Sequence, residues 1–149
     1  MSSLSDRLDQ AFKEALKQRQ EVALSTLRML RTAIRNKEVE LKRKLTEEEV
    51  QAVIGTQAKQ RREAIAEYGK AGRQDLAHKE EEELGILLSF LPPQLSPEEL
   101  ERELARIIAE CGAAGPKDFG KVMKTAMTRF AGRADGKVVQ EIVRRQLSA

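Results

Sequence analysis

Apolar side chains recur at helical spacing along most of this chain. In residues 4–16, leucine or phenylalanine occupies every fourth position, and a similar stripe runs from Ala23 to Ile34. Positions three and four residues apart lie on one face of an α-helix. The pattern therefore predicts two amphipathic helices, the first ending near residue 20 and the second losing its stripe before residue 45.

A third helix has a clear start. Thr46 and Glu49 have the spacing of a capping box, in which each side chain bonds the other residue's free backbone N–H. The helix is therefore expected to span residues 47–68. Gly69 and Gly72 follow and are expected to end it, because glycine readily takes the left-handed conformation found after helices.

The segment PPQLSP, residues 92–97, cannot continue a helix and marks the expected domain boundary. Before it, Asp75 is the expected N-cap of a fourth helix, whose leucines lie between residues 84 and 91. After it, Ser96, Pro97 and Glu99 are a cap, a first helical residue and a capping-box partner, so a helix is expected to start there and stop at Gly112.

Two further helices are predicted in the last third, over residues 119–130 and 138–147, because their apolar residues follow the helical period. The run KVVQEIV does not alternate and fits a helix better than a strand. We predict an all-α protein with a four-helix N-terminal domain (residues 1–91), a proline-rich linker (92–97) and a compact three-helix C-terminal domain (98–149).

The amino-acid composition indicates which class of protein this chain belongs to. Charged residues make up 34% of the chain and aromatic residues only 3%, which is typical of solvated helices and offers few rings for stacking on bases. No segment resembles a signal peptide or a membrane span, and the single cysteine, Cys111, favours a reducing compartment. These features predict a soluble, cytoplasmic protein.

Residues suited to catalysis are scarce. His78 lies among charged residues on an expected surface of its helix, and Cys111 falls on an apolar stripe, so both are read as structural or surface residues. The four adjacent glutamates 80–83 radiate around a helix and do not converge on a cation. Phosphate-binding loops, dinucleotide fingerprints and zinc-ligand spacings do not occur. We expect no catalytic site, no cofactor and no metal.

Arg61 interrupts the apolar stripe of the third helix. A guanidinium on such a stripe needs either a carboxylate partner or a route for its head to water. We expect an ion pair with Glu80 or Glu83, across the turn between the third and fourth helices.

Positive charge gathers in the last third of the chain. Residues 112–149 hold eight basic and three acidic side chains, a net charge of +5, and leave −2 for residues 1–111. Two stripes of cations fall on polar helix faces and could follow a phosphate backbone: Arg28, Arg31 and Arg35, and Lys117, Lys121 and Lys124. For both stripes, solubility or pairing within the molecule is the open alternative.

The stretch AGRADGKVV, residues 131–139, contains both turn and charge signals. Gly132 is expected to stop the preceding helix and Asp135 to cap the next one. Arg133 and Lys137 would then be uncompensated, beside the lysine stripe. The resulting candidate nucleic-acid contacts are Lys117, Lys121, Lys124, Arg129, Arg133 and Lys137.

Four stretches carry a family resemblance: LSTLRMLRTAIRNKEVE, EYGKAGRQDLAHKEEEELGILLSFLPPQLSPEEL, DFGKVM and GRADGKVVQEIVRR. They cover essentially the whole chain, and AGRQDL followed by SFLPPQLS is the most specific block. The sequence resembles the GatB/YqeY family, specifically its small stand-alone YqeY-like bacterial proteins. The resemblance implies a helical N-terminal domain and a small domain similar to the GatB tail of tRNA-dependent amidotransferases, glutamine-dependent carbon–nitrogen ligases whose tail helps hold tRNA.

Only DFGKVM and GRADGKVV match that tail, so the resemblance implies tRNA-contact or turn roles only for Lys121, Arg133, Asp135 and Lys137. Lys124 and Thr128 stand where relatives often have glycine and proline, which predicts a straighter and more basic helix. We expect a non-catalytic accessory protein that binds tRNA or a tRNA-handling complex. The alternatives are a helical protein-interaction module and, less favoured, an amidotransferase acting alone. The sequence leaves the oligomeric state open.

Overall fold

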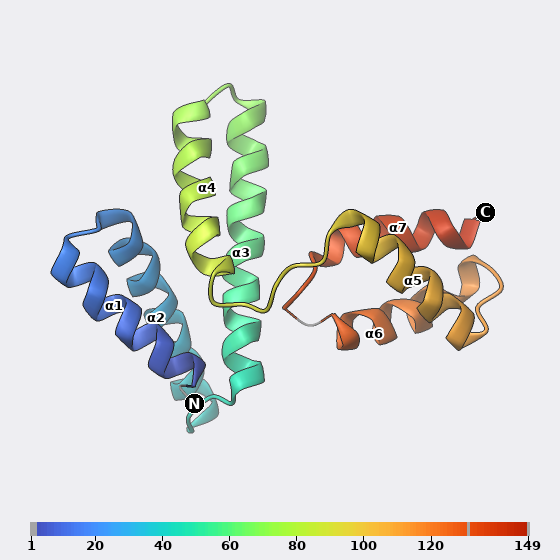
Figure 1. The fold of residues 1–149 in the computed structure, drawn as a ribbon, viewed down its shortest axis with the longest axis horizontal. Coiled ribbons are helices and arrows are strands. Elements are labelled where there is room, and N and C mark those ends of the chain that lie inside the picture. The colour runs from blue at the N-terminus through green and yellow to red at the C-terminus, as the bar shows by residue number, and fades with distance from the viewer. Residues whose placement is uncertain (1–2, 131, 149) are drawn as a thin grey trace. The chain divides into compact units, whose positions relative to one another are not determined.

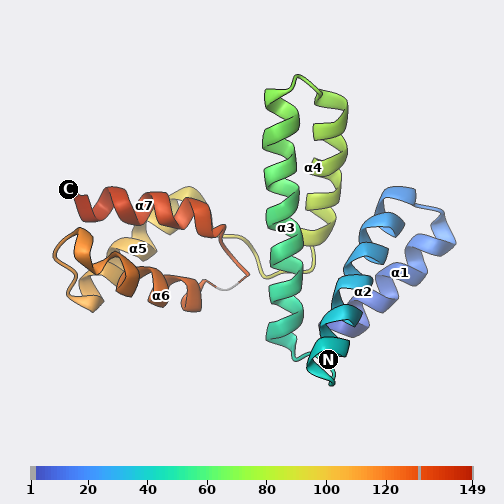
Figure 2. The same ribbon diagram turned by 180° about the vertical axis from the view of Figure 1, so that it is seen from behind.

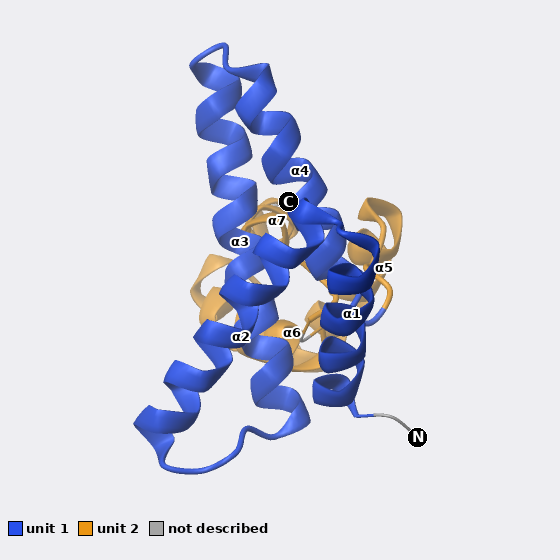
Figure 3. Ribbon diagram, turned by 90° about the vertical axis from the view of Figure 1, so that its left-hand side faces the viewer, with its two compact units in different colours: residues 1–92 blue, residues 93–149 orange. Residues whose placement is uncertain are grey.

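The computed structural model describes residues 3–130 and 132–148, so Ala131 of the AGRADGKVV stretch lies outside the described residues. These described residues form α-helices, one short 3₁₀ helix and connecting turns, with no strand among them. The all-α prediction is confirmed. The chain divides into two compact units, residues 1–92 and 93–149, hereafter unit 1 and unit 2 (Figure 3). That each unit is an independently folding domain stays a prediction.

Unit 1 consists of two helical hairpins (Figures 1 and 2). Its helices are α1 (Leu4–Gln18), α2 (Glu21–Leu41), α3 (Glu47–Lys70) and α4 (Gln74–Leu88). In both views α1 lies beside α2, and α3 lies beside α4. The core joins all four helices through buried apolar side chains that include Leu8, Leu27, Leu30, Ile54 and Leu87. Burial of these side chains is the main favourable term that holds the hairpins together.

The predicted start of α3 is confirmed in its hydrogen bonds. Thr46 Oγ1 accepts from the Glu49 N–H at 3.2 Å, and Glu49 Oε1 accepts from the Thr46 N–H at 2.9 Å. Arg43 also donates to both oxygens of this carboxylate. Hydrogen bonding by Arg43, followed by that of the Thr46 backbone, lowers the pKa of Glu49 to about 2.

The turn between α3 and α4 differs from the prediction. Helix α3 continues through Gly69 to Lys70, and the left-handed residue that turns the chain is Gly72, with φ of 73°. The N-cap of α4 is Arg73, and Asp75 lies in the first turn, where its carboxylate pairs with Arg73 at 3.1 Å. An acidic side chain stabilises the first turn through the helix dipole as well as at the cap, so the sequence signal was correct in kind and wrong in position.

Unit 2 contains α5 (Pro97–Cys111), a 3₁₀ helix η1 (Pro116–Asp118), α6 (Phe119–Arg129) and α7 (Gly136–Ser148). The predicted start at Ser96 is confirmed, with Ser96 Oγ accepting from Glu99 N–H at 3.1 Å. Gly112 ends α5 in the left-handed conformation, as predicted. The core is apolar and includes Leu104, Ile107, Val122, Ala126 and Val143, each fully buried.

Residues 93–96, which the sequence assigned to a linker, belong to unit 2. Leu95 N–H donates to the carbonyl of Arg133 at 2.9 Å. Gln94 Nε2 donates to the carbonyl of Gly132 at 2.7 Å, and Arg133 Nε donates to the carbonyl of Pro93 at 3.1 Å. The proline-rich segment is therefore attached to the turn between α6 and α7.

Helices α6 and α7 run antiparallel. The Arg144 guanidinium lies over the Phe119 ring, 5.1 Å from its centroid, which places the start of α6 against the end of α7. At the other end, Met127 lies against Gly136, the first residue of α7. This arrangement determines where the candidate cations of unit 2 lie.

Candidate functional site

Arg61 lies inside unit 1 with both carboxylates that its position in the sequence suggested. Its Nε is 2.9 Å from Glu83 Oε2 and 3.4 Å from Glu80 Oε2. Arg61 and Glu83 are buried, and Arg61 Nη2 also contacts Met29 Sδ at 3.4 Å. The three charged residues thus connect α3 and α4, and Met29 extends the cluster to α2. This cluster has the character of a structural centre.

The Arg61 cluster carries two acidic groups and one basic group. Burial is the main cause that raises the pKa of Glu83, and the neighbouring Glu80 charge raises it further, while Arg61 offsets part of the shift. Removing either charge sign from such a buried set leaves an uncompensated ion, which is costly in a low-dielectric interior. The stability of the α3–α4 hairpin therefore depends on whether the Glu83 carboxyl is protonated.

In unit 2, three of the predicted nucleic-acid contacts have partners within the unit. Arg129 pairs with Glu110 of α5. Lys121 Nζ donates to the carbonyl of Cys111, the last residue of α5, at 3.1 Å, and a cation is favourable at that end of a helix. The Arg133 guanidinium is held by the Pro93 carbonyl. Arg129 therefore adds no unpaired charge to this surface, because α5 supplies its carboxylate partner.

The other three candidates, Lys117, Lys124 and Lys137, are exposed, and their ammonium groups have no hydrogen bond or ion pair within residues 3–130 and 132–148. These three lysines do not gather at one end of unit 2. Lys117 precedes α6, whereas Lys137 lies in the first turn of α7, and the antiparallel packing puts these two positions at opposite ends of α6. Helical spacing predicted a shared face for the lysine stripe and carried no information on the direction of the next helix.

The first turns of α6 and α7 differ from those of the other α-helices. Each of α1 to α5 has an aspartate or glutamate in its first turn, where a negative charge favours the helix dipole. Neither α6 nor α7 has an acidic residue there, and each has a lysine instead, Lys121 and Lys137. Asp118 and Asp135 directly precede these two helices, so each lysine shares its helix start with a carboxylate one residue outside the helix.

The turn residues of AGRADGKVV lie close to their predicted roles. Gly132 has φ of 74°, in the left-handed region that favours glycine. Asp135 directly precedes α7, and its Oδ1 accepts from the Lys137 N–H at 3.1 Å. The carboxylate is therefore directed at the backbone of the first turn.

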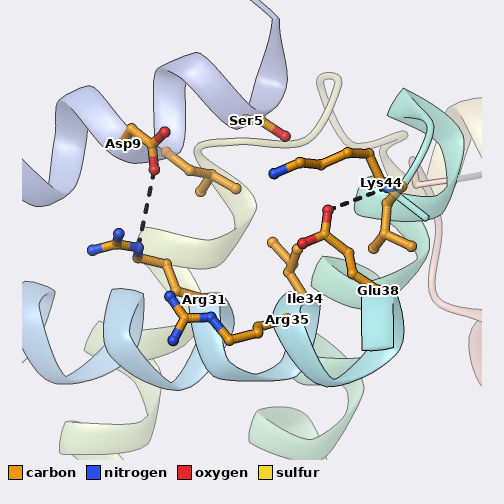
Figure 4. Close-up of a pocket in the computed structure, with 9 residues that line it drawn as sticks. Ser5, Asp9, Arg31, Ile34, Arg35, Glu38 and Lys44 are labelled. Atoms are coloured by element: carbon orange, nitrogen blue, oxygen red, sulfur yellow. Dashed lines mark hydrogen bonds and ion pairs between the residues drawn. The ribbon is translucent and has the colours of Figure 1, made fainter. Parts of the chain in front are cut away.

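The arginine stripe of unit 1 divides in the structure. Arg31 Nε lies 4.0 Å from Asp9 Oδ1, and its guanidinium stacks over Phe12, 4.3 Å from the ring centroid. Arg31 and Arg35 also line a hollow of about 350 Å³ between α1, α2 and the following loop (Figure 4), which Arg28 does not line. Lys44 enters the same hollow from the loop. Sequence spacing identified two of these three cations and missed Lys44, which lies outside any helix.

Two residues considered for chemistry have ordinary contacts. His78 is exposed on α4, with Nε2 3.1 Å from Glu82 Oε1, one turn away. Cys111 is half-buried and its Sγ lies 3.9 Å from Thr125 Oγ1. In the described part of the chain, no group of three His, Cys, Asp or Glu side chains is arranged to hold a metal ion. The same residues include no helix long and apolar enough to cross a bilayer.

Comparison with known proteins supplies the family. A family model described as Yqey-like protein matches residues 5–147, which is nearly the whole chain. This chain belongs to the Yqey-like protein family. The match supports the YqeY part of the expected resemblance, whereas the specific link to the amidotransferase tail stays a prediction.

Several curated relatives share one name, "Altered inheritance of mitochondria protein 41, mitochondrial". The protein from Vanderwaltozyma polyspora is 29% identical over 82% of this chain and 70% of its own length. The Pyrenophora tritici-repentis protein is 29% identical over 92% of this chain and 79% of its own length. The Kluyveromyces lactis protein is 31% identical over 77% of this chain and 66% of its own length.

These names contradict the expected cytoplasmic location, which is wrong by this comparison: the curated relatives are named as mitochondrial proteins. The expectation rested on the lack of a secretory signal and on a single cysteine. Both features argue against export into an oxidising compartment. Neither feature distinguishes the cytosol from other reducing compartments.

Proposed function

We propose that this Yqey-like protein binds tRNA, or docks on a complex that handles tRNA, through a basic face of unit 2 that includes Lys117, Lys124 and Lys137. Its role is that of an accessory protein, related to the glutamine-dependent amidotransferases through their GatB tail and without chemistry of its own. The observation that carries the proposal is that Lys117, Lys124 and Lys137 of unit 2 are exposed and form no ion pair or side-chain hydrogen bond among the described residues.

The physical support is electrostatic. Lys137 lies in the first turn of α7, where a cation opposes the helix dipole and adds to the positive potential of that helix end. Phosphate oxygens are bound well by backbone N–H groups and cations at helix N-termini. The exposed ammonium groups of Lys117, Lys124 and Lys137 add sites for phosphate neutralisation.

The layout favours a structured RNA over a single phosphate group. The unpartnered cations Lys117 and Lys137 lie at opposite ends of α6. A helix of 11 residues is roughly 16 Å long at 1.5 Å per residue. Contacts spread in this way follow a nucleic-acid backbone, and recognition then depends on shape, since the chain has few aromatic rings for base stacking. Affinity is therefore expected to fall steeply with salt.

The test compares tRNA binding by the parent protein with that of Lys124→Gln and Lys137→Gln, measured by filter binding or fluorescence anisotropy across salt concentrations. Both lysines are exposed and have no described partner, so these changes leave the fold intact. Each variant should bind more weakly, and the slope of log K against log salt should shrink by about 0.7–0.9 per lost phosphate contact.

The matched control is Lys13→Gln on α1, which removes the same charge from an exposed position of unit 1. We expect Lys13→Gln to bind tRNA as the parent does. Absence of tRNA binding, or equal weakening by all three variants, would contradict the proposed surface. Arg133 is not a suitable probe, because its guanidinium holds the Pro93 carbonyl.

A protein-interaction module is the second candidate, favoured by exposed apolar side chains on unit 1. Val39 is 71% exposed and Met29 is 46% exposed, both on α2. If a protein partner binds there, a defined complex should survive RNase treatment and be lost in Val39→Ser. Loss of the complex on RNase treatment, with Val39→Ser unaffected, favours the tRNA proposal instead.

A further inference from the structure

We propose that the hollow between α1, α2 and the α2–α3 loop is a binding site for a phosphomonoester that carries a small apolar group. This site lies in unit 1 and is independent of the proposed RNA surface on unit 2. A volume of about 350 Å³ is at the lower end of the range for small-molecule sites. Some of the charged side chains that line it have partners within unit 1, and others do not.

The acidic side chains that line the hollow have partners within unit 1. Asp9 lies opposite Arg31, and the Phe12 ring supports the same guanidinium from its face. Glu38 Oε2 accepts the Leu45 N–H at 3.3 Å and so anchors the loop (Figure 4). These contacts hold the walls of the hollow in place.

Two lining cations have no such partner. Arg35 is exposed on α2, and Lys44 reaches into the hollow from the loop (Figure 4). Among the described residues, neither cation forms an ion pair or a side-chain hydrogen bond. Arg35 and Lys44 line the hollow from different walls, and an anion bound in it would be attracted to both.

The chemistry of these groups favours a phosphomonoester over a carboxylate. Arg35 offers a planar fork of donors and Lys44 a point charge, and together they match the dianion of a phosphomonoester. Ser5, from the first turn of α1, adds a hydroxyl donor at the same wall. A carboxylate has one charge and two oxygens, and would leave part of this set unused.

The remaining walls indicate what the phosphate is attached to. Leu8, Ile34 and Leu45 line the hollow beside the cations, and Leu8 belongs to the unit 1 core. Apolar side chains at this position favour a ligand with an apolar portion next to the phosphate, because burying that portion removes it from water. A bare phosphate ion would gain only the polar contacts.

The test uses phenyl phosphate as the probe, with binding followed by ¹⁵N chemical shifts of the full chain. Shifts should centre on residues 5–9, 31–38 and 44–45. Inorganic phosphate and benzoate should bind more weakly, since each lacks one half of the proposed ligand. Binding should tighten between pH 5.5 and pH 7.5, as the second phosphate proton, with a pKa near 6, is lost. Benzoate binding as tightly as phenyl phosphate would overturn the proposal.

Arg35→Gln and Lys44→Met each remove one cation, and each should weaken phenyl phosphate binding by roughly tenfold, the effect of losing one charge-assisted contact. Arg28→Gln is the matched control: it lies on the same helix two turns away, loses the same charge and does not line the hollow. Equal weakening by Arg28→Gln would show general charge attraction and overturn the site. Displacement of phenyl phosphate by an RNA oligonucleotide without terminal phosphate would assign the hollow to nucleic acid, which also overturns it.

Discussion

The two units of this protein place their charges in different ways. Unit 1 buries Arg61 and Glu83, with Glu80 beside them, in the middle of its longest hairpin. Unit 2 has an apolar core and keeps its ion pairs, such as Arg129 with Glu110 and Arg145 with Glu101, at the surface. Surface pairs contribute little to stability, whereas removing the cation from a buried set leaves uncompensated charge.

This difference between the units indicates which charged side chains the fold does not need, and which could therefore serve in binding. In unit 1 the most buried charges hold α3 on α4, and their loss should unfold the hairpin. In unit 2 the fold depends on apolar packing, so exposed lysines can be changed without loss of structure. Lys137, in the first turn of α7, opposes the helix dipole and is one of these replaceable lysines.

The largest expected effect is that of Arg61→Ala. It leaves two carboxylates close together with no cation, so unit 1 should lose about 3–5 kcal/mol of unfolding free energy. Urea unfolding followed by circular dichroism measures the loss. Lys59→Ala, two residues away on the exposed face of α3, should change stability by less than about 0.5 kcal/mol. Similar stabilities for the two variants would refute a structural role for the cluster.

The corresponding destabilising substitution in unit 2 is Leu104→Ala. Leu104 is fully buried in the apolar core, and its truncation should cost about 2–5 kcal/mol through lost burial and a cavity. If the units fold independently, amide exchange should accelerate in α5, α6 and α7 and remain unchanged in α1 to α4. Acceleration across the whole chain would show that the two units unfold together.

Lys137→Gln should have a smaller and opposite effect on stability. Removing a cation from the positive end of α7 should raise the unfolding free energy of unit 2 by roughly 0.3–1 kcal/mol. The same variant should weaken tRNA binding, so stability and binding change in opposite directions. A variant that loses stability would mean that Lys137 has a structural role.

The smallest expected effect is a difference in pH dependence. The folded-state pKa of Glu83 is raised, so the folded protein binds more protons than the unfolded chain between the ordinary pKa near 4.5 and the raised value. Stability contributed by Glu83 therefore falls as pH rises through that window. Glu83→Gln should remove this contribution.

In unit 2 the pH dependence has the opposite sign. Hydrogen bonds from Arg145 and Gln146 lower the pKa of Glu101, so the stability that Glu101 contributes is lost as pH falls below about 4.5.

Local features of the fold were predictable from the sequence because they depend on neighbours along the chain. The capping boxes at Thr46 and Ser96 and the burial of Arg61 on an apolar stripe all follow from spacing within one helix or its flanks. The cap of α4 was misplaced by two residues, since Asp75 fits a first turn as well as a cap.

Features that depend on the direction of neighbouring helices were not predictable in the same way. Spacing placed Lys117, Lys121 and Lys124 on one helix face, but the antiparallel course of α7 decides that Lys137 lies at the opposite end of α6. The partner of Arg129 comes from α5, 19 residues earlier. The hollow in unit 1 needs α1, α2 and the α2–α3 loop together, and a periodic pattern in one segment carries no sign of it.

The attachment of residues 93–96 to the α6–α7 turn has a practical consequence for dissecting the molecule. A fragment that begins at residue 98, where sequence reasoning placed the domain start, would lack the carbonyl that receives the Arg133 guanidinium and the amide that meets the Gly132 carbonyl. In that fragment the Arg133 guanidinium and the Gly132 carbonyl would have to form hydrogen bonds with water instead. A fragment that begins at Pro93 retains these contacts, and is the shortest piece in which the basic face should keep its native shape.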